Sequence, residues 1–404
     1  MKYKRIKNIY WGLVFAIILL TLNCLGGCAT KANLGDISKL SFKPTRKIVS
    51  SEETVNINAD RVFKIVSSIQ ELNQSNPFMF RVSHLKSRDN EDHAIFTENF
   101  TRQFIFGNKA QTHWYTVAYD ETKRIYSALL MDEGIVYGRY KVEVIDMGGT
   151  ASKIKNSIMY TALNEKGVAL LEKTPDSKIL ELLKIMNSSA KYYADNGKPL
   201  AREKTRSGQP GALKAFTSKF YQTSATGKVI GSADESFHMA GGIEELCWVP
   251  RWNFNLLYSD KKNGRTGNNT VFEESGYARY MYLRTDLPVY WHVVSYDKDN
   301  HEFQIAMNFS GELLSRIALK FKDAEGDNTI WNAEFTYASL SERGNELMAQ
   351  RGGLYLDFPE KIKISPKGLI KYAQYHKKTG KIYEQSPWWL FKVGTSAIWG
   401  TLFR

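Results

Sequence analysis

TALNEKGVALLE (residues 161–172) and ASLSERGNELMA (residues 338–349) are two versions of one short pattern in the same chain. The matching positions are Leu163, Glu165, Gly167 and Leu170 in the first stretch and Leu340, Glu342, Gly344 and Leu347 in the second. In each stretch an alternating strand pattern passes into a helical pattern at Asn164 or Ser341, residue types that cap the first turn of helices. The pattern therefore predicts a strand that turns directly into a helix, once in each half of the chain.

The similarity extends well beyond this phrase. The chain aligns with itself at an offset of 177 residues, without a gap from Trp114 to Leu171, and about 13 of about 58 aligned pairs are identical. Identical pairs include Trp114 with Trp291, Tyr119 with Tyr296, Gly134 with Gly311, Arg139 with Arg316 and Tyr160 with Tyr337. Similarity at one fixed offset indicates a duplicated folding unit, and 404 residues with 43% hydrophobic residues suffice for two cores.

The secondary-structure patterns follow the same order in both copies. In the first copy, an alternating strand at 54–58 leads into an amphipathic helix that begins at Ala59. Further alternating runs, separated by turn residues, cover 79–85, 94–100, 112–119, 124–131, 138–146 and 151–162. The closing helix comes last. This order predicts an α+β fold class, with an antiparallel sheet and a C-terminal helix in each half.

The first 28 residues have the composition of a targeting segment. Basic residues near the N-terminus precede an apolar run at 9–22, which ends in LGGC (residues 25–28). This ending resembles the lipobox of bacterial lipoproteins, and the resemblance implies cleavage before Cys28 and lipidation of its thiol. Ala29 implies, by resemblance to sorting rules in Gram-negative bacteria, an outer-membrane anchor facing the periplasm. The alternative is an uncleaved anchor helix, because residues 9–25 are about long enough to span a bilayer.

Two motifs of the second copy resemble a bacterial subgroup of the START/SRPBCC superfamily, which includes polyketide cyclases and lipid-transfer domains. CWVPRW (residues 247–252) resembles the Trp-Ile-Pro-x-Trp motif of this subgroup, and LSERGN (residues 340–345) resembles its Leu-Ser-x-x-Gly-Asn phrase. The resemblance implies two tandem helix-grip domains, each a curved antiparallel sheet wrapped around a long C-terminal helix. The first copy has NPF (residues 76–78) in place of the Trp-Pro-Trp motif, so the ligand inference is weaker there.

The combined patterns divide the chain into six predicted segments. They are a signal peptide with lipobox (1–28), an N-terminal linker (29–50), a first SRPBCC-like domain (51–198), a linker (199–233), a second SRPBCC-like domain (234–382) and an aromatic C-terminal tail (383–404). The tail is rich in tryptophan, which favours either a membrane contact or a clasp that packs back on the protein.

The helix-grip resemblance implies an apolar cavity, and six residues are candidates to line it. They are Trp114, Trp291, Trp248, Trp252, His113 and His292. Two interpretations of Trp114 and Trp291 stay open: they line a ligand cavity, or they are ordinary core residues, for which tryptophan is also typical. The two histidines flank the paired tryptophans, but a lone histidine on a strand is more often a surface or hydrogen-bonded residue.

No catalytic motif stands out. The chain has no Gly-x-Ser-x-Gly elbow, no phosphate-binding glycine loop and no His-Glu-x-x-His sequence. Of three cysteines, Cys24 leaves with the signal peptide and Cys28 takes the lipid, so that only Cys247 remains. We therefore expect no catalytic residue, no metal and no cofactor. The net charge of +13 is first of all typical of a solvated basic surface, and it also suits anionic lipid headgroups or phosphorylated glycans. An exported protein is not expected to bind nucleic acid.

These observations lead to one functional prediction and two alternatives. The prediction is non-catalytic binding of an apolar or amphipathic small molecule, such as a lipid, in the helix-grip cavities of a lipoprotein held at a membrane through Cys28. The first alternative is a cyclase-like or hydratase-like enzyme that acts on a hydrophobic substrate. The second is a structural or interaction protein of the cell envelope in which the cavities have collapsed.

Overall fold

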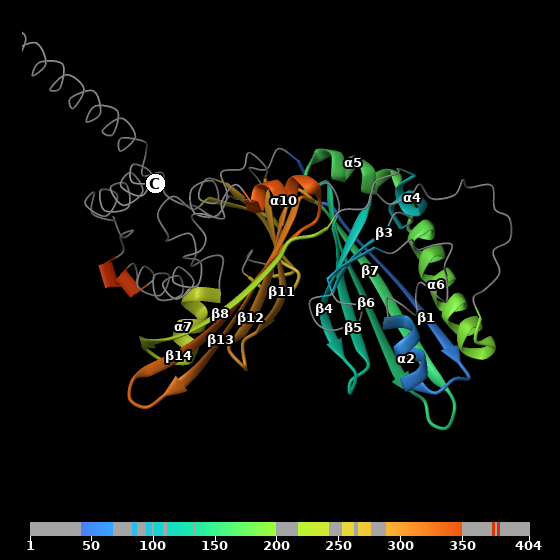
Figure 1. Ribbon diagram of the computed structural model, residues 1–404, viewed down its shortest axis with the longest axis horizontal. Helices are drawn as coiled ribbons and strands as arrows, with labels where there is room; N and C mark the ends of the chain where they lie inside the picture. The colour runs from blue at the N-terminus through green and yellow to red at the C-terminus, as the bar shows by residue number, and fades with distance from the viewer. Residues whose placement is uncertain are drawn as a thin grey trace, which may run out of the picture. The chain divides into compact units, whose positions relative to one another are not determined.

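The computed structural model describes residues 42–67, 83–86, 94–98, 101–107, 111–131, 134–198, 217–241, 253–261, 266–275, 288–349, 374–375 and 378–379. All of these residues belong to one compact unit, and they form two antiparallel sheets (Figure 1). The fold class is therefore α+β, as predicted. We call residues 46–196 the first repeat and residues 220–349 the second repeat.

The two sheets have the same topology. In the part of the chain that the structure describes, each has seven strands, ordered β1-β7-β6-β5-β4-β3-β2 and β8-β14-β13-β12-β11-β10-β9. The first sheet consists of β1 (Arg46–Val55), β2 (Ser83–Lys86), β3 (Ile95–Glu98), β4 (Thr112–Asp120), β5 (Ile125–Met131), β6 (Val136–Asp146) and β7 (Ser152–Ala162). The second consists of β8 (Phe220–Ile230), β9 (Asn253–Tyr258), β10 (Val271–Ser275), β11 (Val289–Asp297), β12 (Glu302–Phe309), β13 (Leu313–Ala324) and β14 (Asn328–Ser339). The two halves that are similar in sequence thus also have the same strand order.

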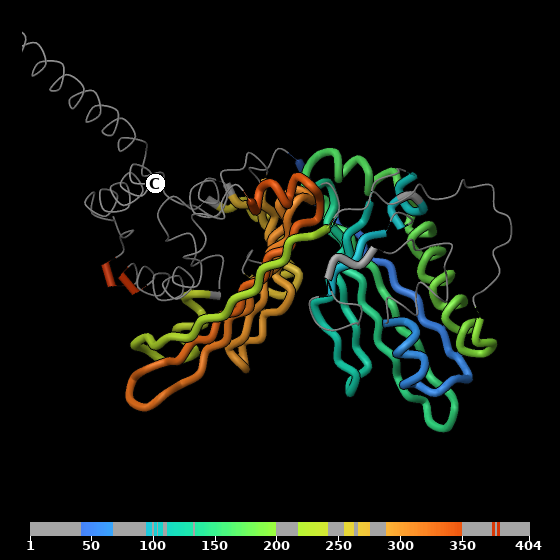
Figure 2. Tube along the Cα trace, in the orientation of Figure 1, coloured from blue at the N-terminus to red at the C-terminus, as the bar shows by residue number. Residues whose placement is uncertain are grey.

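In both sheets the first strand in sequence pairs with the last. The chain reaches this arrangement by returning β7 beside β1 and β14 beside β8, as Figure 2 shows for β8 and β14. The remaining strands form a meander of hairpins. Along each strand, successive side chains point to opposite faces of the sheet. The pairing register therefore decides which residues face the helices and which face away.

Among the described residues, four helices accompany the first sheet: α2 (Ala59–Ser67), α4 (Thr101–Phe106), α5 (Glu165–Lys173) and α6 (Asp176–Asn196). Pro175 separates α5 from α6, since proline is accepted at the start of a helix but not inside one. Ile179, Leu182 and Leu183 of α6 belong to the same buried cluster as Ile154 and Ile158 of β7. We call the face of each sheet that carries this core the inner face.

The second sheet is accompanied by α7 (Ala233–Gly241) and α10 (Glu342–Ala349). Helix α7 follows the first strand of its repeat as α2 does, and Phe237 of α7 is fully buried against the sheet. A second-repeat counterpart of α6 would fall largely after residue 349, outside the described residues. The predicted long helix of the second domain therefore stays a prediction.

The structure differs from two of the predicted segment boundaries. Strand β8 lies in the range 199–233, which the sequence patterns predicted as a linker, and β1 begins at Arg46, inside the predicted linker 29–50. The reason for the first difference is Gly227, where a Cβ would collide with the Trp331 ring of β14. At Gly227, strand β8 therefore covers the apolar Trp331 ring with backbone alone, and the sequence shows no apolar residue there that would indicate a strand.

The repeated phrase forms the predicted strand-to-helix junction in both repeats. Asn164 Oδ1 accepts the Gly167 amide hydrogen at 3.0 Å, and Ser341 Oγ accepts that of Gly344 at 3.0 Å. A Cβ at Gly167 would collide with the carbonyl oxygen of Ile135, and a Cβ at Gly344 would collide with the same atom of Glu312. Glycine is therefore required because the first helical turn lies directly on the backbone of the turn between β5 and β6, or between β12 and β13 in the second repeat.

The faces of the two sheets that point away from the helices share one buried apolar cluster. We call these the outer faces. The cluster joins Tyr115, Val117, Leu129, Met131, Tyr137 and Leu163 of the first repeat with Leu257, Val271, Tyr290, Val294, Ala306, Leu314 and Leu340 of the second. Leu163 and Leu340 of the repeated phrase both belong to it. The phrase thus specifies a helix cap and a contact between the repeats at the same time.

Candidate functional site

A buried carboxylate and an indole ring are paired in the same way in both repeats. Trp114 Nε1 donates to Glu98 Oε1 at 3.1 Å, and Trp291 Nε1 donates to Glu274 Oε2 at 2.6 Å. Each indole also stacks on a phenylalanine of the neighbouring strand, with ring centroids 5.4 Å apart in both cases. Trp114 and Trp291 therefore hold equivalent places on the two inner faces, and both are buried.

The sequence patterns did not single out the two glutamates. Glu98 is fully buried, and its Oε2 also accepts the backbone N–H of Thr101 at 2.8 Å, which begins α4. A buried carboxylate is stable when its oxygens receive hydrogen bonds of this kind. The usable signal was the recurrence of a glutamate 16 or 17 residues before each tryptophan. The geometry indicates that these glutamates position the strands and the tryptophans.

The inner face of the first repeat carries further polar groups between the sheet and α6. Tyr126 and Tyr140 are fully buried side chains, and the Thr116 hydroxyl lies 3.4 Å from the Tyr126 hydroxyl. Burial raises the pKa of both tyrosine hydroxyls, so they remain neutral. Asn156 of β7 donates to Asn187 Oδ1 of α6 at 2.7 Å. The Asn156 amide also lowers the pKa of Tyr140, against the larger effect of burial, so it lies close to the Tyr140 hydroxyl.

The two asparagines leave hydrogen-bonding capacity unused. Asn156 Oδ1 and Asn187 Nδ2 are buried, and neither atom has a hydrogen-bond partner in the structure. An unpartnered buried amide atom costs about 1–3 kcal/mol, which is avoided when a water or a ligand group supplies the missing partner. We call Tyr140, Asn156 and Asn187 the amide site.

The second repeat has apolar residues at the corresponding places. At the offset of 177 residues, Thr116, Tyr126, Tyr140 and Asn156 correspond to Val293, Phe303, Ile317 and Ala333. Val293, Phe303 and Ala333 are buried in the second core, with Ile317 packed against it. This inner face keeps isolated polar atoms such as Trp331 Nε1, in place of an amide pair. The two repeats therefore share a fold but differ in the chemistry of their inner faces.

The two candidate histidines lie next to the tryptophans in sequence, and alternation along the strand places them on the outer faces. His113 Nδ1 lies 2.8 Å from Thr97 Oγ1, and burial lowers the pKa of His113 to about 4. The His292 ring lies 4.4 Å from the Tyr137 ring of the first repeat. Burial, with Arg139 and Arg46 nearby, holds the pKa of His292 well below its usual value.

His113 makes the stability depend on pH. Its pKa is about 4 in the folded protein and about 6.5 without burial, so the unfolded chain binds the proton first as the pH falls. The stabilisation is complete above pH 6.5 and is lost between pH 6.5 and 4. In urea unfolding at pH 7.5 and 4.5, we expect the wild type to lose about 2–3 kcal/mol more than His113→Gln. Equal losses in the two proteins would contradict this assignment.

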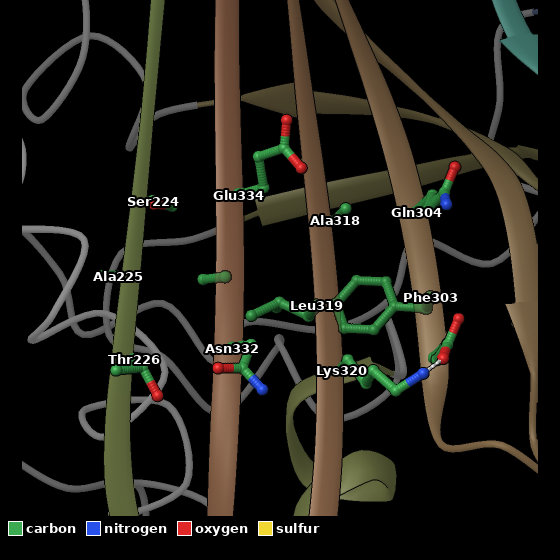
Figure 3. A pocket seen from close by; sticks show the side chains of 12 residues that line it. Ser224, Ala225, Thr226, Phe303, Gln304, Ala318, Leu319, Lys320, Asn332 and Glu334 are labelled. Atoms are coloured by element: carbon green, nitrogen blue, oxygen red, sulfur yellow. Dashed lines mark ion pairs between the residues drawn. The ribbon is translucent and has the colours of Figure 1, made fainter. Parts of the chain in front are cut away.

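Two open spaces lie on the outer faces. One, of about 790 Å³, is lined from the first repeat by Ile48, Arg139 and Met159 and from the second by Asn269 and Val294, among others. We call it the cleft. The other, of about 580 Å³, extends over β8, β14, β13 and β12, and Figure 3 shows side chains that line it, among them Gln304, Lys320 and Glu334. Lys320 forms an ion pair with Glu302, which also lines this space. Gln304 lines both spaces, so they adjoin.

Several predicted site residues cannot be placed. Trp248, Trp252 and Cys28 lie outside the described residues, and so does the whole tail 383–404. Over the ranges that are described, no helix is both long and apolar enough to cross a membrane. Over the same ranges, no three His, Cys, Asp or Glu side chains are grouped to hold a metal ion.

Comparison with known proteins gives structural similarity alone. No protein-family model matches the chain, and no curated protein matches it. One similar solved structure is norcoclaurine synthase from Thalictrum flavum, 15% identical, covering 36% of this chain and 86% of that chain at a TM-score of 0.30. Major latex-like protein 151 from Panax ginseng is 15% identical and covers 37% of this chain and 97% of its own, at 0.31.

A third similar structure has two domains. The di-domain ARO/CYC BexL from the BE-7585A biosynthetic pathway is 12% identical, covering 84% of this chain and 100% of that chain at a TM-score of 0.31. At such identities and TM-scores, neither the activities nor the ligands of these proteins are carried over to this chain.

Proposed function

We propose that this protein binds an amphipathic small molecule whose polar end is held at the amide site of the first repeat. The observation that supports the proposal is the pair of buried, unpartnered atoms Asn156 Oδ1 and Asn187 Nδ2. One atom accepts a hydrogen bond and the other donates one, which suits a hydroxyl, amide or carboxylic acid group. The surrounding inner face is aromatic and aliphatic, which suits an apolar body.

Binding in this proposal is non-catalytic. Glu98 is a buried carboxylate, a residue type that can serve as a catalytic acid. Its two oxygens already accept hydrogen bonds from Trp114 Nε1 and the Thr101 amide. The nearby tyrosines stay neutral, since burial raises their pKa values. These groups recognise a polar atom by hydrogen bonding, without supplying a nucleophile or a base.

Extraction of the purified full chain tests the proposal. We expect liquid chromatography and mass spectrometry of the organic extract to reveal a molecule with a polar end and an apolar body. It should be enriched over the extract of an unrelated lipoprotein purified in the same way. An extract that contains only the membrane phospholipids, in the proportions of the control, would contradict the proposal.

The lipoprotein anchor is part of the same proposal, because a membrane-bound carrier has direct access to amphipathic molecules. Its basis is the lipobox-like sequence LGGC (residues 25–28). We expect Cys28→Ser to abolish incorporation of radiolabelled palmitate and to leave the N-terminal segment uncleaved. Cys24→Ser is the matched control and should be lipidated normally. Palmitate incorporation that persists in Cys28→Ser would refute lipidation at this residue.

A further inference from the structure

The cleft contains a cation whose charge is not balanced by a carboxylate. Arg139 donates to Ser127 Oγ at 3.0 Å, to Asn269 Oδ1 at 2.6 Å and to the Val294 carbonyl at 3.0 Å. All these acceptors are neutral. Within the described part of the chain, no ion pair includes Arg139.

Arg46, a second arginine near Asn269, has a carboxylate partner that balances its charge. It also reaches Asn269, whose carbonyl accepts its Nη2 at 2.7 Å. Unlike Arg139, Arg46 forms an ion pair with Asp260 at 3.0 Å and lies 3.3 Å from the centre of the Tyr258 ring. A largely desolvated guanidinium without a counter-charge is costly, and a bound anion removes that cost.

The rest of the cleft suits an anion with an apolar chain. Lys141 lies on the same face as Arg139, two residues along β6, and is exposed to solvent. Ile48, Met159 and Val294 supply apolar surface, and Ile48 is 61% exposed although it is a large aliphatic residue. Two carboxylates also line the cleft. Asp120 forms an ion pair with Lys123, and Glu121 accepts a hydrogen bond from the Tyr119 hydroxyl while keeping its negative charge.

We propose that the cleft between the outer faces is a second binding site, which takes the anionic head of an amphipathic molecule on Arg139 and Lys141 and its chain along Ile48 and Met159. This site is separate from the amide site, since the two lie on opposite faces of the first sheet. A volume of about 790 Å³ is in the range of small-molecule sites. The head is a free fatty carboxylate or the headgroup of an anionic phospholipid.

The test is photolabelling of the full chain in phosphatidylcholine nanodiscs with a diazirine-bearing dodecanoic acid, followed by peptide mapping. We expect the label on peptides that contain residues 117–121 or 157–159, and competition by dodecanoate but not by dodecanol. Competition by added phosphatidylglycerol would identify a lipid headgroup as the natural anion, and its absence would identify a free acid. Equal labelling by the dodecanol analogue would overturn the proposal.

Substitutions of Arg139 and Lys141 test whether the photolabelling depends on their positive charges. Arg139→Gln keeps an amide donor toward Asn269 and Val294, and it should reduce labelling about tenfold. Lys141→Gln changes an exposed side chain, so it serves if Arg139→Gln fails to fold, and it should reduce labelling about twofold. Lys173→Gln, on the exposed face of α5, is the control and should label as the wild type does. Unchanged labelling in both cleft variants would overturn the proposal, whatever the outcome at the amide site.

Discussion

Replacing Gly167 with alanine should destabilise the protein by about 3 kcal/mol or more, although glycine to alanine inside a helix ordinarily stabilises it. The added Cβ collides with the Ile135 carbonyl oxygen. That oxygen also accepts the Leu163 amide at 2.9 Å, so it cannot move away without breaking the strand-to-helix junction. Urea unfolding of the full chain, followed by circular dichroism, measures the effect.

Two further variants make this prediction specific. Lys166→Ala changes an exposed side chain on the same helical turn and should alter the unfolding free energy by less than about 0.5 kcal/mol. Gly344→Ala should repeat the loss in the second repeat, where the Glu312 carbonyl takes the place of Ile135. A Gly167→Ala protein that is more stable than the wild type would show that the close approach at this junction does not exist.

Replacing Glu98 with alanine should destabilise the protein by about 4 kcal/mol. The substitution leaves Trp114 Nε1 and the Thr101 amide buried without their acceptor and removes packed atoms next to α4. Each buried donor left without a partner costs about 1–3 kcal/mol. Urea unfolding of the full chain, followed by circular dichroism, measures the loss.

The controls for Glu98 separate the hydrogen bonds from the charge. Glu98→Gln keeps one acceptor oxygen, so we expect a loss clearly smaller than that of Glu98→Ala. Glu172→Ala removes an exposed carboxylate on α5 and should have little effect. If Glu98→Ala and Glu172→Ala prove equally stable, the buried carboxylate does not support the tryptophan as described.

Local patterns were enough to predict the duplicated topology. Alternation marked most strands, and the capping residues Asn164 and Ser341 marked where the closing helices begin. Strand β8 was missed because the apolar surface that it covers, the Trp331 ring, belongs to its neighbour. The middle of this strand, residues 222–228, is small and polar, so it carries no alternation that a single sequence reveals.

The candidate site was less predictable, for a related reason. Trp114 and Trp291 were identified from the repeat, but their partners Glu98 and Glu274 lie one strand away and depend on the pairing register. Asn156 and Asn187 are 31 residues apart and meet only when α6 packs on the sheet. A polar residue on a strand or helix gives no local sign that it will be buried, because its burial is decided by tertiary contacts.

The most direct test of the proposed function is the amount of extracted molecule retained by a protein that carries both Asn156→Ala and Asn187→Leu. Removing both partners of a buried hydrogen bond together leaves no unpaired amide, and Asn187→Leu keeps a side chain of similar size; circular dichroism and urea unfolding check that this protein folds. Asn196→Leu, on the exposed end of the same helix, is the control. We predict that the double variant loses the co-purified molecule almost completely while Asn196→Leu keeps the wild-type amount. A folded double variant that keeps the full amount would contradict the account.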